Sequence, residues 1–145
     1  MKLLIIGEAP GPSGAADPLG GRASRFLAQL ADRSQDAFLL AVERRNLLDS
    51  WPGGDGEGSA FPLYAAAEAA RVVRPTLDGR RVLLLGRVGQ VFGIQQGWYE
   101  WVYLGTARVA RFPHPSGLNR LWNDQAERRA AGRFLRAALY LAEHQ

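Results

Sequence analysis

Short apolar runs alternate with amphipathic segments along the chain. Residues 2–6 (KLLII) are almost entirely apolar and stop at Gly7, as a buried parallel strand does. Residues 22–33 (RASRFLAQLADR) then place Phe26, Leu27 and Leu30 at helical spacing. The pattern therefore predicts a strand, a loop and a helix at the start of the chain.

The same alternation continues to the last residues. Further strands are expected near 45–48, at 80–86 (RRVLLLG) and at 107–113 (ARVARFP). The further helical segments expected are 37–42, an alanine-rich helix from 63 that Pro75 and Gly79 stop, 87–94, and a closing helix from 124 onward. Strands that alternate with helices predict a small α/β domain with a largely parallel, four-stranded sheet.

The closing helix is expected to bury one apolar face against this sheet. Its apolar positions recur at helical spacing. They are Ala131, Phe134, Leu135, Ala138, Leu141 and Ala142.

Four loops that carry polar residues follow the predicted strands. They are GEAPG (7–11), NLLDSWPG (46–53), LLLGR (83–87) and HPSGLNR (114–120). Ligands of parallel α/β sheets bind beyond the carboxyl ends of the strands. The four loops are therefore expected to converge on one site.

Length and composition narrow the classes of protein. A chain of 145 residues fits a single domain. It contains no cysteine, which excludes disulfides, thiol catalysis and thiolate-bound metal or iron–sulfur clusters. The apolar run at the N-terminus is far shorter than a signal peptide or a membrane span requires, so a soluble cytoplasmic protein is expected.

The charge balance is modestly basic. Lys and Arg number 18 against 14 Asp and Glu, and every base except Lys2 is arginine. Arginine suits bidentate contacts with phosphate and stacking on bases. The balance is thus compatible with a nucleic-acid partner without being diagnostic of one.

The GEAPG loop supplies a carboxylate at the end of the first strand. Its glycines and prolines permit close approach of a ligand and fix the direction of the loop. Glu8 could position a water or stabilise a cationic transition state. An acid that merely caps a turn is the structural alternative.

The HPSGLNR loop holds a histidine between two prolines. His114 could donate a hydrogen bond to an oxygen that gains negative charge, or could simply cap a strand end. Ser116 and Gly117 could offer a hydroxyl and a backbone N–H to a phosphate. Leu118 could wedge between stacked bases or be tucked into the core.

Side chains elsewhere could recognise a base. The amide of Asn46 donates and accepts at once and so matches a pyrimidine edge such as that of uracil, although it could equally satisfy a turn. Five aromatic residues could stack on bases or belong to the core: Trp51, Trp98, Tyr99, Trp101 and Trp122.

Taken in order, these motifs resemble the uracil-DNA glycosylase superfamily over most of the chain. The ordered set is GEAPG, PLGGRASRFL, RNLLDSWPG, RVLLLGRVGQVFG and HPSGLNR. HPSGLNR is similar to the NPSGLNR of mismatch-specific uracil/thymine-DNA glycosylases. GEAPG with PLGGRA resembles the bacterial and archaeal iron–sulfur branch, but without cysteine the chain is excluded from that branch.

The resemblance implies a fold and a mechanism. The fold is a single-domain, three-layer αβα sandwich, and the reaction is hydrolysis of the N-glycosidic bond of a flipped-out uracil or related base. His114 would stabilise the uracil anion. Asn46, with Gly7 and Ala9, would bind the base. Glu8 would hold the water or offset the sugar cation, and Asp17 is a second candidate for the water.

The resemblance also implies contacts with DNA. Leu118 would fill the gap left in the duplex. The other DNA-binding candidates lie in the same two loops and are Pro10, Gly11, Ser116, Gly117, Asn119 and Arg120. A monomer that acts on uracil- or mismatch-containing DNA without metal or cofactor is expected.

Two other functions fit the same pattern. One is a noncatalytic member of this fold that binds DNA or a base. The other is a small-molecule enzyme that acts on free nucleosides or nucleotides, in which Leu118 would have no wedge role.

Overall fold

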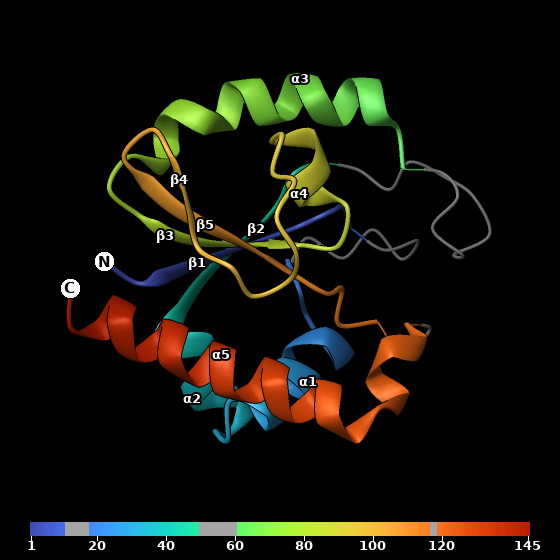
Figure 1. Ribbon diagram of the computed structural model, residues 1–145, viewed down its shortest axis with the longest axis vertical. Coiled ribbons are helices and arrows are strands. Elements are labelled where there is room, and N and C mark those ends of the chain that lie inside the picture. The colour runs from blue at the N-terminus through green and yellow to red at the C-terminus, as the bar shows by residue number, and fades with distance from the viewer. Residues whose placement is uncertain (11–17, 50–60, 117–118) are drawn as a thin grey trace.

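The computed structural model describes residues 1–10, 18–49, 61–116 and 119–145. It is an α/β fold in which one mixed, mostly parallel sheet lies between two layers of helices (Figure 1). The strands are β1 (Leu3–Gly7), β2 (Val42–Asn46), β3 (Arg81–Leu85), β4 (Val102–Leu104) and β5 (Ala107–Phe112). The helices are α1 (Arg22–Leu30), α2 (Gln35–Ala41), α3 (Leu63–Val73), α4 (Val88–Val91) and α5 (Gln125–Glu143), with 3-10 turns η1 (Arg74–Leu77) and η2 (Arg120–Asn123).

The sheet has the strand order β2-β1-β3-β5-β4. Strand β1 pairs in parallel with β2 and β3, and β3 pairs in parallel with β5. Strand β4 is antiparallel to β5 and joins it through a turn at Gly105 and Thr106. The predicted α/β class and parallel core are confirmed, and the predicted number of four strands is wrong because β4 was missed.

Strand β2 is an edge strand that starts earlier than predicted. Helix α2 ends at Ala41, and Val42 is already extended with φ −128° and ψ 156°. Glu43 and Arg45 are exposed on β2. Charged side chains on an edge discourage pairing with a second sheet, which is why β2 lacks the apolar run that marks β1 and β3.

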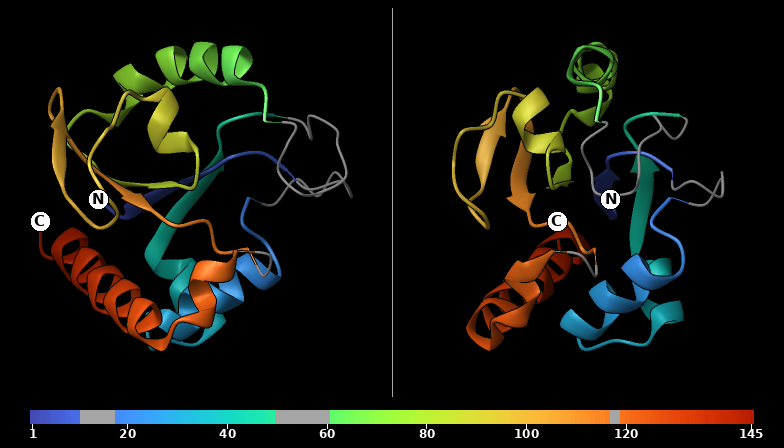
Figure 2. Two further views of the ribbon diagram at one scale, coloured as in Figure 1. Left: turned by 45° about the vertical axis from the view of Figure 1, so that its right-hand side comes forward. Right: turned by 90° about the vertical axis from the view of Figure 1, so that its right-hand side faces the viewer.

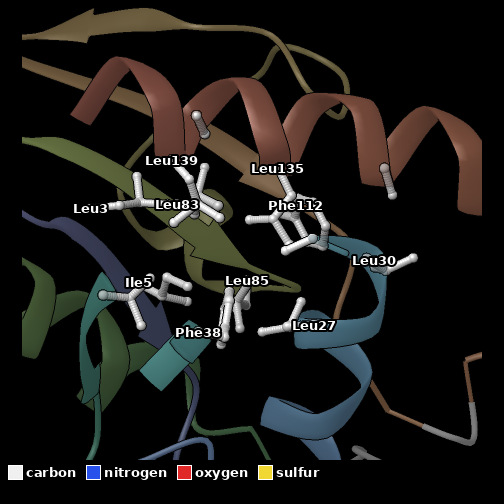
Figure 3. Packing of buried hydrophobic residues seen from close by; sticks show 14 of the residues in the cluster. Leu3, Ile5, Leu27, Leu30, Phe38, Leu83, Leu85, Phe112, Leu135 and Leu139 are labelled. Atoms are coloured by element: carbon white, nitrogen blue, oxygen red, sulfur yellow. The ribbon is translucent and has the colours of Figure 1, made fainter. Parts of the chain in front are cut away.

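Each face of the sheet has its own hydrophobic core because strand side chains alternate between faces. Leu3 and Ile5 of β1 pack with α1, α2 and α5, as Figure 3 shows. Leu4 and Ile6 pack on the opposite face with α3 and α4. The sheet is therefore buried on both faces, with α3 and α4 on one side and α1, α2 and α5 on the other (Figure 1).

Helix α5 lies close to α1, and this contact sets which of its residues are buried. A Cβ on Gly132 would lie 2.9 Å from the carbonyl oxygen of Leu30, and Arg136 donates to the same oxygen at 2.9 Å. Leu139 is fully buried, whereas Leu141 is 38% exposed. The prediction that Leu141 belongs to the buried face is wrong, since the contact with α1 rotates that face toward Leu139.

The carboxyl ends of β1, β3 and β5 lie at one edge of the sheet. Residues 113–116 leave β5 at this edge and lead to η2, which lies beside α1 in both views of Figure 2. Trp122 of η2 contacts Phe26 of α1, with ring centroids 4.9 Å apart. No helix in the described part of the chain is long and apolar enough to cross a membrane.

Candidate active site

Glu8 follows β1 directly, and its carboxylate is bound by Arg87. Oε2 accepts from the backbone N–H of Arg87 at 3.0 Å and from its Nε at 3.2 Å. Oε1 accepts from Nη2 at 2.9 Å. The side chain of Glu8 is only 14% exposed. The carboxylate is thus a buried, charge-paired group rather than a solvated turn acid.

Gly86 follows β3 directly and lies next to Glu8 and His114. Its φ is +57°, and its N–H donates to the carbonyl of Phe112 at 2.9 Å. A Cβ at Gly86 would lie 2.7 Å from Oε2 of Glu8 and 3.2 Å from Cβ of His114. A glycine at this position therefore lets the carboxylate of Glu8 and the side chain of His114 both approach the space that a Cβ would fill.

The backbone of His114 is anchored by the residues that follow it. Its carbonyl oxygen accepts from Nδ2 of Asn119 at 3.1 Å and from Nε1 of Trp122 at 2.9 Å. Oδ1 of Asn119 accepts from the N–H of Leu121 at 3.1 Å and so caps η2. The neighbouring Pro115 is buried. His114 is held by this network as well as by its prolines.

The electrostatic setting of His114 favours the neutral ring. Burial is the main cause that lowers its pKa from the ordinary 6.5, and the charge of Arg87 acts in the same direction. The carboxylate of Glu8 opposes both. A neutral imidazole has one N–H with which to donate a hydrogen bond to a developing anion.

Whereas the environment of His114 favours the neutral form, the environment of Glu8 favours the ionised form. Burial, the largest contribution, raises its pKa, but the hydrogen bonds from Arg87 and the positive charges of His114 and Arg87 outweigh it. The net pKa lies below the ordinary 4.5. Near neutral pH the site therefore presents a carboxylate and a neutral imidazole, both next to Gly86.

Asn46 lies at the end of β2, in register with Gly7 of β1. A Cβ on Gly7 would lie 3.4 Å from Oδ1 of Asn46 and 3.2 Å from Cδ2 of Leu19. The N–H of Leu47 donates to the carbonyl of Gly7 at 2.8 Å. These contacts join the GEAPG and NLLDS loops, so the structure places Asn46 beside the loop that carries Glu8.

The remaining predicted site residues have mixed positions. Ala9, Pro10 and Ser116 are half-buried in the loops that flank Glu8 and His114, and Arg120 is exposed at the start of η2. Both ends of the amide of Asn119 bond within the chain, so its observed role is to position the His114 loop. Gly11, Asp17, Gly117 and Leu118 lie outside the described residues, and their predicted roles stay predictions.

Most of the candidate aromatic residues pack within the protein. Trp122 is 5% exposed and contacts Phe26 and Phe112. Tyr99 and Trp101 pack against Phe134. Trp98 is 37% exposed, and the guanidinium carbon of Arg111 lies 4.4 Å from the centroid of its ring. Trp51 lies outside the described residues. Trp122 thus has a structural role at the site.

Arg87 was not identified from the sequence. The LLLGR loop was expected at this edge, but an arginine after a strand is common and its partner is remote in the sequence. A sequence signal for Arg87 does exist. The GEAPG loop contains an acid, Glu8, and the LLLGR loop, at the end of the neighbouring strand, contains a base that could pair with it.

The low pKa of His114 predicts a loss of stability in mild acid. Below pH 6.5 the unfolded chain binds a proton at this residue that the folded protein does not, so the free energy of unfolding falls as pH falls. Urea midpoints at pH 7.5 and 5.5 should show the decrease. The low pKa of Glu8 acts in the same direction but only below pH 4.5.

The two histidines of the chain provide a matched pair of variants for this prediction. His114→Gln should reduce the difference between the two urea midpoints. His144→Gln, at an exposed position near the C-terminus, should leave it unchanged. Equal sensitivity to pH in both variants would show that His114 is not the responsible group.

Comparison with known proteins adds no family assignment. No protein-family model matches the sequence, and no curated protein matches it either. Within the described residues, no three His, Asp or Glu side chains are grouped as a metal site requires. The functional interpretation therefore depends on the motifs and on the site itself.

Proposed function

We propose that the protein is a monofunctional DNA glycosylase that hydrolyses the N-glycosidic bond of uracil, or of a related deaminated or modified base, in DNA. The observation that carries the proposal is the arrangement of Glu8 and His114 around Gly86. Cleavage of the N-glycosidic bond produces a sugar cation and a base anion. An ionised carboxylate can stabilise the cation, and a neutral imidazole can donate a hydrogen bond to the anion. The order of motifs along the chain supports the same assignment.

The proposed reaction separates charge between the sugar and the base. The bond between C1′ and the base nitrogen breaks, and its electron pair goes to the base. Glu8 stabilises the oxocarbenium-like sugar, and His114 donates a hydrogen bond to the oxygen of the departing uracil anion. The oxygen of a water then bonds to C1′, one O–H bond of that water breaks, and the proton released, passed on directly or through solvent, restores neutral uracil.

The placement of Asn46 supports recognition of a base at this site. Asn46 is on β2, and its amide oxygen lies near Gly7 of β1. Strand β1 leads directly to Glu8. An amide can donate to a uracil carbonyl and accept from its N3–H at the same time. Such a pair of contacts distinguishes uracil from cytosine, whose N3 has no hydrogen.

DNA is the proposed partner, and the protein is proposed to act on it as a monomer. A flipped nucleotide would enter from the edge where the GEAPG and HPSGLNR loops meet. Arg120 is the last residue of the HPSGLNR loop and the first of η2, and its exposed side chain can reach a phosphate. The wedge role of Leu118 is part of the same proposal.

Treatment of oligonucleotides that contain uracil, a T:G mismatch or hypoxanthine with the protein and then alkali should give strand scission on at least one of these substrates. Single-stranded DNA and duplexes with U:A, U:G, T:G and hypoxanthine pairs form the panel, and at least one should be cleaved. A double variant with Glu8→Gln and His114→Ala, purified identically, controls for a contaminating host glycosylase. Binding should weaken as salt rises, since phosphate contacts release counterions.

Other results of this assay have definite meanings. DNA binding without scission on any substrate would contradict the proposal and indicate a noncatalytic DNA-binding protein. Release of uracil from free deoxyuridine, with no action on DNA, would indicate a nucleoside-processing enzyme.

A further inference from the structure

The pairing of Glu8 with Arg87 restricts what Glu8 can do. A carboxylate offers about four acceptor positions, and Arg87 fills three of them with its backbone N–H, Nε and Nη2. Oε2 takes two of these bonds, so the remaining position is on Oε1. The carboxylate can therefore meet at most one further donor without breaking a bond to Arg87.

Arg87 is itself held on a second side. Its guanidinium lies over the ring of Phe61, 4.6 Å from the centroid. Phe61 is buried just before α3 and is 8% exposed. A planar guanidinium stacked on a ring while bonded in a fork to a carboxylate is fixed in direction. Glu8 is thus bonded to a rigid partner.

We propose that Arg87 is a positioning residue that keeps Glu8 as a fixed, ionised carboxylate, so that Glu8 offsets the sugar cation and orients the water but does not remove its proton. This inference rests on the proposed function. It specifies that Glu8 acts on the water and the sugar cation as a fixed charge rather than as a general base.

The basicity of Glu8 supports the fixed charge. A general base works best when its pKa lies near the working pH, and the bonds from Arg87 hold the pKa of Glu8 below 4.5. Among the described residues, the charged or titratable groups that face Glu8 are Arg87, between β3 and α4, and His114, after β5. Without the guanidinium, burial would raise the pKa of Glu8 and the carboxylate would lose its charge more easily.

The first test measures the ionisation of Glu8 and needs no activity. The ¹³C resonance of its side-chain carboxyl, assigned with Glu8→Gln, is titrated in the full-length protein and in Arg87→Met. Methionine keeps an apolar stem against Phe61 and removes the guanidinium donors. The midpoint for Glu8 should rise by about one pH unit or more. Arg87→Lys, which keeps the charge but not the fork, should fall between the two.

The second test measures single-turnover excision of uracil against pH with the same variants. Arg87→Met should reduce the rate a few-fold more at pH 5 than at pH 8, because Glu8 is partly protonated at pH 5. Adding Arg87→Met to Glu8→Gln should cause no such pH-dependent loss. Arg71→Met, which breaks the exposed pair with Glu68, is the matched control and should leave the profile unchanged.

The outcomes separate this inference from the proposed function. An active protein in which Arg87→Met and Arg87→Lys leave the Glu8 midpoint unchanged would overturn the inference alone. So would a solvent deuterium isotope effect on bond cleavage that is lost in Glu8→Gln, since Glu8 would then take up a proton. A protein without excision activity whose Glu8 midpoint still depends on Arg87 would overturn the proposed function, and the reaction role of Arg87 with it.

Discussion

Replacing His114 by alanine should lower the rate of uracil excision by roughly 100- to 1000-fold. The reason is the loss of one hydrogen-bond donor to the leaving anion, a loss that costs about 2.7–4 kcal/mol at comparable oxyanion sites. The backbone anchors should persist, because Asn119 and Trp122 bind the carbonyl of His114 and not its ring. Single-turnover rates with excess enzyme measure the effect without a contribution from product release.

Two further variants serve as controls for His114→Ala. His114→Asn keeps an N–H donor and should recover part of the rate, as the asparagine of the similar NPSGLNR motif suggests. His144→Ala changes the other histidine and should have no effect. An unchanged rate in His114→Ala, with the fold verified by circular dichroism, would refute the role in anion stabilisation.

Gly86→Ala should damage both stability and catalysis. Alanine at φ +57° is strained by roughly 1–2 kcal/mol. Its Cβ would also lie 2.7 Å from Oε2 of Glu8. That oxygen cannot move aside easily, because the backbone N–H and Nε of Arg87 hold it. Displacement of the carboxylate by about 1 Å should reduce excision by roughly 100-fold.

Gly105→Ala separates the two consequences. Gly105 also has a positive φ, +62°, but a Cβ there would meet no atom within 4 Å. It lies in the turn between β4 and β5. This control should lose similar stability in urea unfolding and keep the wild-type excision rate. Equal rates for both glycine variants would show that Gly86 is needed for the turn alone.

The main strands could be predicted because they are buried on both faces. Strands β1 and β3 are continuous apolar runs that only a parallel sheet covered by helices accommodates. Strand β4 could not be predicted in the same way. It has three residues, none of them fully buried, and its pairing with β5 supplies the backbone bonds that define it.

The placement of Glu8, Asn46 and His114 at one edge of the sheet was also predictable in outline. All three follow parallel strands, and the carboxyl ends of such strands share one edge. The partners of these residues were not predictable. Arg87 binds Glu8 across a separation of 79 residues, and the amide of Asn119 bonds within its own loop, where the sequence suggested only a contact with DNA.

The α/β alternation, the strand-end loops and the types of residue in those loops follow from local hydrophobic periodicity and loop chemistry, which short segments of the chain already contain. The ionisation of the site, by contrast, depends on the fold. The pairing of Glu8 with Arg87 and the burial of His114 depend on how β1, β3 and β5 lie beside one another. The charge of a buried group is set by its neighbours in space, not by its neighbours along the chain.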